Sequence, residues 1–500
     1  MASKCLEFLK SLIRKKPLNL VHSESNNSQM KRTLGKYDLI SLGIGCTIGS
    51  GIFVLTGQVA KDIAGPSVVL SFVVSAFCSS LTAFSYAELS TIIPSSGAAY
   101  SFIMVALGEI FAWIACCCIF LQYLVGAATI ASGWGKYFSH LLDNIFKVML
   151  PHSISSSPIN TNVDNGKIEI DKTAIMNLPA FFIVLVITFV QLAGIKESAA
   201  FNNIIVVVKT ASILFFVFIG IKYINRDNYS PFIPPREDDR YGIPGIFLGA
   251  QRLYMAFVGF DSVASASHEA INVKKDLPIG IVVSLFICTI LYVAVAAVLC
   301  GVQKYTMIDS GAISKIFSQF SNTLWIEIII NLGALSGLTS AILVNLIAQS
   351  RVIMTVATDG LLPSCFARIH HKLKTPYWAT LVCGLVCMIL SSFFPTSLLA
   401  DLASCGSLIV YFFVNISVLV LRKTNPEIER SYKVPFSPYL ISGLGAFVCL
   451  VLLYFSEAQT KIRIGSYLAV VILIYVLYSR RKSKVLQNAI DNDERDSVEK

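Results

Sequence analysis

The sequence predicts an all-α integral membrane protein with about twelve transmembrane helices. Hydrophobic residues make up 55% of the 500 residues and charged residues only 14%, whereas soluble domains carry about 25% charged residues. Apolar runs of about 18 residues or more, typical of membrane spans and rare in soluble proteins, recur along the chain. We predict spans near residues 38–57, 66–93, 108–138, 178–194, 199–224, 243–266, 279–302, 323–357, 376–394, 398–421, 438–456 and 463–479.

The distribution of basic residues predicts that both termini face the cytoplasm. The first 36 residues are polar and basic, and we expect no cleavable signal peptide because they lack an apolar core. Basic clusters recur in loops at 274–275, 368–374 and 422–433, which the predicted spans place on the same side. The chain therefore divides into a cytosolic segment (1–36), a transporter-like membrane domain (37–480) and a cytosolic tail (481–500).

The formal net charge of +10 follows from this topology. Basic segments beside a bilayer attract anionic lipid, so membrane lipid is an expected partner and nucleic acid is not. The plasma membrane is the first candidate location, ahead of a vacuolar or lysosomal membrane.

The first predicted span is interrupted by glycines. Four of them fall between Gly43 and Phe53, and each weakens a helix by about 1 kcal/mol relative to alanine. A break here would leave the N–H groups of Gly49, Ser50 and Gly51 at the start of a half-helix, an arrangement that attracts a carboxylate. Close packing of small residues between helices is the alternative, and the spacing leaves both open.

A second interruption falls in the sixth predicted span, at residues 256–263. Unwound carbonyls there would accept hydrogen bonds from an ammonium group, so Phe257, Val258 and Phe260 are substrate-binding candidates. The two phenylalanine rings would form walls that also attract a cation. Asp261 needs a partner at membrane depth, and a cap on the following half-helix is the favoured interpretation over a coupling role.

The two interruptions lie five spans apart, so the second repeat unit would be inverted relative to the first. Broken helices in matching positions of inverted repeats mark the binding site of many secondary carriers. Donors for a carboxylate and acceptors for an amine together complement a zwitterionic amino acid.

Lys209 falls near the middle of the apolar run 201–220. A charge at this depth costs about 2.5–3.5 kcal/mol on insertion scales, and such residues usually face the interior of the bundle. We therefore predict that Lys209 is a proton-linked or gating element.

Other polar residues at membrane depth have two interpretations each. Gln122 and Asn345 either line a polar pocket or bond a neighbouring helix. Asp401 is either a gate near the outer end of the tenth span or a helix cap. Glu88 and Glu109 lie near the cytoplasmic ends of their spans, where solvated or loop-capping roles are favoured.

No catalytic, metal or cofactor pattern is evident in the sequence. The 13 cysteines include three consecutive ones at 116–118, which do not suit one tetrahedral site. The histidines fall in or near loops, and no Ser/His/Asp or metal-ligand arrangement lies near the spans. We expect no enzyme activity, no cofactor and no metal.

Several motifs resemble those of the amino acid–polyamine–organocation superfamily, in the same order and spacing over residues 33–480. The motifs from residue 256 onward resemble those of its cationic amino acid transporter branch. The motifs are GSGIFVLTG (49–57), AGP (64–66), YAEL (86–89), PSSGAAY (94–100), AFVGFD (256–261), DLPIGI (276–281), RVI (351–353), DGLLP (359–363) and KVPF (433–436).

This resemblance implies a LeuT-like fold of five plus five inverted helices followed by two more. It implies that main-chain N–H groups at Ser50 and Gly51 bind the substrate carboxylate, and that carbonyls near Ile44 and in the second break bind the amine. Lys209 matches the lysine that replaces a sodium ion in sodium-independent members. Asn345 occupies a position where a small polar residue accompanies cationic substrates.

We therefore predict alternating-access transport of amino acids, with arginine, lysine and ornithine as first candidates. A proton-coupled carrier of neutral amino acids and a non-transporting amino acid sensor are the alternatives.

Overall fold

The computed structural model describes residues 14–18, 20, 33–49, 51–161, 168–193, 199–237, 240–267, 269–308, 313–370 and 375–483. Ser50 and most of the predicted terminal segments 1–36 and 481–500 lie outside the described residues.

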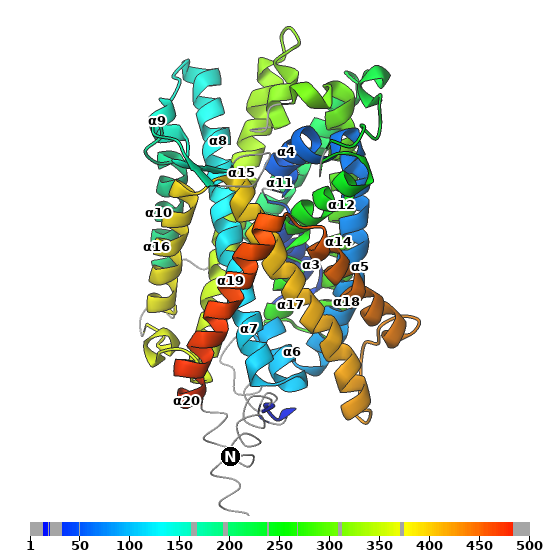
Figure 1. Ribbon diagram of the computed structural model, residues 1–500, viewed down its shortest axis with the longest axis vertical. Helices are drawn as coiled ribbons and strands as arrows, with labels where there is room; N and C mark the ends of the chain where they lie inside the picture. Colours follow the sequence, from blue (N-terminus) through cyan, green and yellow to red (C-terminus); the bar gives the residue numbers. More distant parts are fainter. Residues whose placement is uncertain are drawn as a thin grey trace, which may run out of the picture.

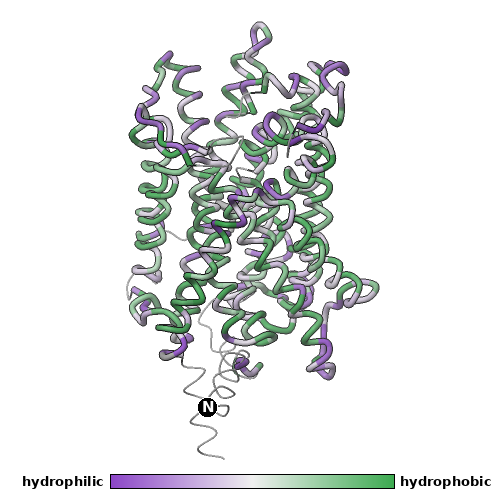
Figure 2. Tube along the Cα trace, in the orientation of Figure 1, coloured by the Kyte–Doolittle hydropathy of each residue, from purple (hydrophilic) through white to green (hydrophobic). Residues whose placement is uncertain are grey.

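Long helices aligned with the longest axis make up the molecule (Figure 1). Hydrophobic residues cover the middle of the bundle and hydrophilic residues gather at its two ends (Figure 2). In the described ranges, eight helical stretches are long and apolar enough to cross a membrane, and three shorter apolar helices accompany them. The first stretch, Lys36–Ile92, holds two spans because the chain turns at Gly65, whose φ is 64°. The predicted membrane bundle is thereby confirmed.

Two spans are broken near half-depth, as predicted. In the first, α3 (Lys36–Thr47) ends before Ile48, and helical structure resumes in η1 (Gly51–Leu55), α4 (Thr56–Val59) and η2 (Ala60–Ala64). In the sixth, α12 (Gly242–Leu253) and the 3₁₀ turn η6 (Tyr254–Phe257) end at Val258, whose ψ of 127° is extended. Gly259, at φ 137°, redirects the chain before α13 (Ser262–Ser265).

The other spans are continuous or nearly so. They are α5 (Val68–Ile92), α7 (Glu109–Phe120) with η4 (Leu121–Val125) and α8 (Gly126–Phe146), α10 (Leu178–Leu192), α11 (Ala199–Ile221), α14 (Val273–Val302), α15 (Leu324–Thr358), α16 (Tyr377–Phe393), α17 (Thr396–Thr424), α18 (Pro438–Tyr454), and α19 (Ala458–Ile474) with η10 (Tyr475–Ser479). Shorter pieces connect them: η3 (Gly65–Ser67), α6 (Ala99–Ala106), α9 (His152–Ser155), η5 (Arg226–Tyr229), η7 (Tyr305–Met307), η8 (Ile313–Phe317), η9 (Ser364–Ala367) and α20 (Arg480–Lys482).

The third span differs from its prediction. The helix continues to Phe146 instead of ending near residue 138, because the polar residues of its last turns have partners on α15: His140 Nε2 lies 3.1 Å and Asn144 Nδ2 lies 3.2 Å from Glu327 Oε2. The following segment also forms an antiparallel pair, β1 (Ile159–Thr161) and β2 (Ile168–Ile170), which we did not predict.

Packing between helices places the two broken spans together. Helix α14 packs against both α3 and α5, α13 contacts α3, and η1 contacts η6. The first span runs toward the end where α4 lies, and α12 starts near that same end (Figure 1), as an inverted pair requires.

Both described ends of the chain lie at the other end of the bundle. The Lys16 ammonium is 3.0 Å from Asp359 at the end of α15. The Ser483 hydroxyl donates to Glu109 at the start of α7 (2.6 Å). The N- and C-terminal parts therefore share one side of the membrane, and its assignment to the cytoplasm stays a prediction.

Candidate functional site

The main chains of the two breaks are in direct contact. A Cβ added to Gly51 would overlap Ala256, and one added to Gly259 would lie 2.6 Å from the carbonyl carbon of Cys46 and from Thr47 N. Glycine is therefore required at both positions by close approach. Gly51 is packed closely against Ala256, as the packing alternative expects, and both Gly49 and Gly51 also line the cavity described below.

Tyr292 of α14 joins the two breaks. Its hydroxyl lies 2.7 Å from the Thr47 carbonyl and 2.8 Å from the Ala256 carbonyl. One O–H proton is therefore shared between carbonyls of the first and the sixth spans.

A small cavity lies between the breaks. Its volume of about 10 Å³ has room for about one water molecule, so this is a closed conformation and an amino acid requires the halves to separate. The lining residues come from both broken spans and from the third and eighth: Cys46, Thr47, Gly49, Gly51, Gln122, Gly126, Ile130, Met255, Val258 and Asn345.

The cavity contains five of the predicted substrate-binding residues. Gly49, Gly51, Gln122, Val258 and Asn345 line it. Asn345 also donates to the Ala341 carbonyl of its own helix (2.8 Å). The alternative prediction, that Asn345 bonds a neighbouring helix, is therefore not confirmed.

Three predicted residues do not line the cavity in this conformation. The Ile44 carbonyl accepts the Ile48 N–H at 3.0 Å. The Phe257 ring packs against Phe72 and Tyr292, and the Phe260 ring packs against Tyr86 and Tyr411. Neither ring lines the cavity, so the prediction that these rings wall the site is wrong for this conformation, because each ring packs against aromatic rings of neighbouring spans. Ser50 lies outside the described residues.

Sequence reasoning missed the apolar part of the lining. Gly126, Ile130 and Met255 belong to apolar spans, and hydropathy does not distinguish a residue that faces a cavity from one that faces lipid. The interruption of the third span by η4, immediately before Gly126, leaves no glycine or proline signal within Leu121–Val125.

Lys209 faces the interior of the bundle, as predicted for its charge. Its side chain is completely buried. The ammonium donates to the Gly45 carbonyl and to the Ile48 carbonyl, the latter at 3.3 Å. The lysine therefore lies at the carboxyl end of α3, where the helix dipole favours a cation.

Asp261 does not cap the following half-helix. No N–H of α13 bonds its side chain. Instead, Oδ1 accepts the Gly259 N–H at 3.0 Å, and Oδ2 accepts from Gln122 Nε2 (2.6 Å) and from the Tyr123 hydroxyl (2.8 Å). The cap prediction is wrong because two donors on the third span reach the carboxylate, which the local sequence does not reveal.

Asp401 is not a helix cap either. It lies within α17, is 4% exposed, and forms a two-pronged pair with Arg252 of α12 at 2.7 and 2.6 Å. Arg252 also reaches Glu457, at 3.0 Å. Sequence reasoning missed Arg252, although a lone arginine in an apolar span was an available signal.

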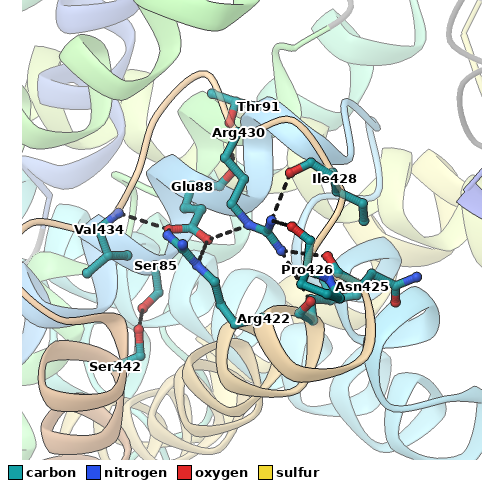
Figure 3. Close-up of polar contacts among 11 residues, drawn as sticks. Ser85, Glu88, Thr91, Arg422, Asn425, Pro426, Ile428, Arg430, Val434 and Ser442 are labelled. Carbon is teal, nitrogen blue, oxygen red and sulfur yellow. Dashed lines mark hydrogen bonds and ion pairs between the residues drawn. The ribbon is translucent and has the colours of Figure 1, made fainter.

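Glu88 and Glu109 are both buried, and only Glu88 caps a loop; Glu109 accepts from the Tyr475 hydroxyl at 3.1 Å and from the Ser483 hydroxyl at 2.6 Å. Glu88 is 1% exposed and accepts two hydrogen bonds from Arg422 (2.8 and 2.7 Å) and one from the Val434 N–H (2.9 Å) (Figure 3). Arg430 approaches the same carboxylate at 3.4 Å and bonds carbonyls at the end of α17, among them Leu421 and Asn425. This cluster joins α5 to α17 at the end of the bundle opposite Arg252.

Two facing broken helices at half-depth, with a cavity between them inside a membrane bundle, define the class of secondary carriers. Comparison with known proteins identifies the family. Residues 34–478 match the family model described as amino acid permease, and the chain belongs to the amino acid permease family, within the predicted superfamily.

Relatives that are named for different substrates are similar to this chain over most of its length. A methylthioribose transporter of Bacillus subtilis (strain 168) is 39% identical over 475 residues, 95% of this chain and 99% of the relative. A branched-chain amino acid permease, BcaP, of the same organism is 38% identical, with 95% and 99% covered. The vacuolar cationic amino acid transporter 2 of Arabidopsis thaliana is 34% identical, with 84% and 64% covered. All are named as permeases or transporters, none as an enzyme.

Proposed function

We propose that this chain transports amino acids with neutral side chains by alternating access, with the substrate held between the broken first and sixth spans. The observation that carries this proposal is the composition of the cavity between the breaks. Gly126, Ile130 and Met255 make one part of the wall apolar, and no described residue that lines it carries a charge. An apolar side chain fits such a wall, and a cationic one would lack a counter-ion there.

The two ends of the substrate have distinct partners in this proposal. The N–H groups of Gly49, Ser50 and Gly51 bind the carboxylate, and carbonyls near Ile44, Phe257 and Phe260 bind the ammonium group. The main-chain contact between the breaks supports the assignment, since separating them would expose both sets of groups together.

Four charged residues control the conformational change in the proposal. Lys209 stabilises the exposed end of α3, Asp261 takes part in coupling, and Asp401 with Arg252 closes the outer end. The burial of Lys209 and the two-pronged pair of Asp401 support these roles.

Cationic amino acids are the second candidate substrates. The Gln122 amide oxygen is buried and has no hydrogen-bond partner in the described part of the chain, so it offers an acceptor for an arginine, lysine or ornithine side chain. The plant relatives named as cationic amino acid transporters also favour this choice.

Uptake into liposomes that contain the purified full-length chain tests the proposal. Labelled leucine should accumulate, unlabelled leucine should compete, and leucinamide should not, because it lacks the carboxylate. Competition by arginine alone would favour the cationic candidate, and competition by methylthioribose alone would show that no zwitterion is recognised. A chain that binds leucine without moving it would be a sensor.

A matched pair of variants tests whether uptake depends on the cavity. Met255→Trp should abolish leucine uptake because the larger side chain fills the space between the breaks. Met307→Trp is the control, since Met307 is 72% exposed and outside the cavity. Equal uptake by both variants would place the site elsewhere.

Microscopy of the tagged chain in its own cells would test the predicted plasma-membrane location.

A further inference from the structure

A second cavity lies directly beyond the substrate cavity. Asp261, Tyr123 and Ser265 line its polar side, and Ala98, Ile119 and Val352 its apolar side. It lies toward the end of the bundle that carries both described chain ends, since Tyr100, two residues after Ala98, donates to Asp359 at 2.8 Å. The two cavities therefore follow one another between the breaks and the predicted cytoplasmic surface.

Adjacent residues of η4 separate the two cavities. Gln122 lines the substrate cavity, and Tyr123 lines the second one. Both donate to the same oxygen of Asp261, at 2.6 and 2.8 Å. All three side chains are at least 96% buried, and Asp261 itself lines the second cavity.

The surroundings of Asp261 are neutral. The titratable groups that face it are the phenols of Tyr123 on the third span, Tyr86 on α5 and Tyr411 on α17. Within the described residues, no ion pair reaches its carboxylate; its hydrogen bonds come from Gln122, Tyr123 and the Gly259 N–H. A buried carboxylate without a counter-ion favours binding a proton.

The Gln122 amide is only half satisfied. Nε2 donates to Asp261, and Oε1 is buried without a hydrogen-bond partner among the described residues. When Asp261 carries a proton, its O–H becomes a donor. Rotation of the amide by half a turn then brings Oε1 to that O–H and directs Nε2 to the substrate cavity.

We propose that Asp261 is a proton-binding site and that its protonation changes which group of the Gln122 amide faces the substrate cavity. With Asp261 ionised, the amide presents an acceptor to the substrate; with Asp261 protonated, it presents a donor, which suits a carboxylate. A proton taken up together with substrate forms an O–H bond on the Asp261 carboxylate, and that bond breaks when the proton leaves toward the second cavity. The inference rests on the proposed transport of a zwitterion and names the ion coupled to it.

Linkage makes the effect measurable. If the proton strengthens substrate binding, substrate strengthens proton binding by the same factor. The KM for leucine should therefore fall as the pH is lowered, by about 5- to 150-fold in total if the coupling is typical of linked sites.

The test uses liposomes that contain the full-length chain and a pH-sensitive dye. Labelled leucine uptake and internal acidification are recorded together between pH 5 and pH 8. The wild type should acidify the interior as leucine enters. Asp261→Asn should move leucine without acidification and with a KM that does not vary with pH. Gln122→Met, which also changes the lining of the substrate cavity, should raise the KM for leucine and weaken the dependence of that KM on pH.

Gln191→Met is the matched control, because Gln191 is a buried glutamine on α10 that bonds Ser350 at 3.2 Å and lines neither cavity. It should behave as the wild type does. Thermal stabilisation of the wild type by leucine, which should increase as the pH falls, provides a readout if Asp261→Asn does not fold.

The outcomes separate the two proposals. Leucine uptake without acidification in the wild type, or acidification that persists in Asp261→Asn, overturns the proton site and leaves transport intact. Stabilisation by leucine that is constant with pH also overturns it. Absence of uptake of any amino acid overturns the proposed function instead.

Discussion

The freed main-chain groups of the two breaks are stabilised in different ways. The first exposes carbonyls at the end of α3, and the long Lys209 side chain reaches them from another span. The sixth uses its own Asp261, which binds the Gly259 N–H and two donors of the third span. An interrupted helix in a membrane therefore needs a partner for its freed main-chain groups, and that partner comes either from the same segment or from a neighbour.

The largest expected effect is at the contact between the breaks. Gly259→Ala should abolish uptake and lower the melting temperature, since a φ of 137° and a Cβ 2.6 Å from main-chain atoms of the first break leave no room. Strain and overpacking together should cost about 2–6 kcal/mol. Gly465→Ala is the control, because no atom lies within 4 Å of its added Cβ. Normal uptake by Gly259→Ala would mean that the breaks are not in contact.

The sixth span also has a charged anchor that is independent of its break. Asp401→Asn should destabilise the protein by about 3–5 kcal/mol, because it leaves the buried Arg252 without its main partner. Glu457→Gln should cost no more than about 1 kcal/mol, since the Glu457 side chain is 32% exposed. Thermal unfolding in detergent would measure both. Equal effects would show that Asp401 contributes no more than a surface charge does.

Removal of the lysine tests how the first break is stabilised. Lys209→Met keeps the length of the side chain but leaves the Gly45 and Ile48 carbonyls without this donor. A buried group that loses its partner costs about 1–3 kcal/mol, which predicts a fall in uptake of about 5- to 150-fold. Lys222→Met, at an exposed position just after the same helix, should have no effect. Full activity of Lys209→Met, with unchanged pH dependence, would rule out its proposed role.

The smallest effect is expected where one group serves both breaks. Tyr292→Phe removes the shared O–H from Thr47 and Ala256, and hydrogen bonds between membrane helices average about 0.6 kcal/mol. The melting temperature should fall slightly, and uptake should persist. Tyr439→Phe, at a 62% exposed side chain, provides the baseline. A complete loss of uptake would mean that this hydroxyl has a direct part in transport.

The spans and both breaks could be predicted because their signals are local. Apolar length predicts a span, and the glycines around Gly49 and Gly259 weaken helices wherever they occur. The burial of Lys209 followed from the cost of a charge in lipid. Five of the residues that line the cavity could also be predicted from local signals. They belong to the interrupted segments or are polar residues at membrane depth.

The partners of the polar groups could not be predicted in this way. Arg252 and Asp401 are 149 residues apart, and Asp261 meets Gln122 across 139 residues. The Phe257 ring packs against Phe72 and Tyr292, which belong to other spans.

The sequence by itself determined the class of protein, the number of spans and where two of them break, because hydropathy and glycine flexibility act over a few neighbouring residues. Only the tertiary structure decided which donor meets which acceptor and which apolar side chains face the cavity. Those choices depend on how distant helices pack, and many pairings of the same polar residues are compatible with one hydropathy pattern.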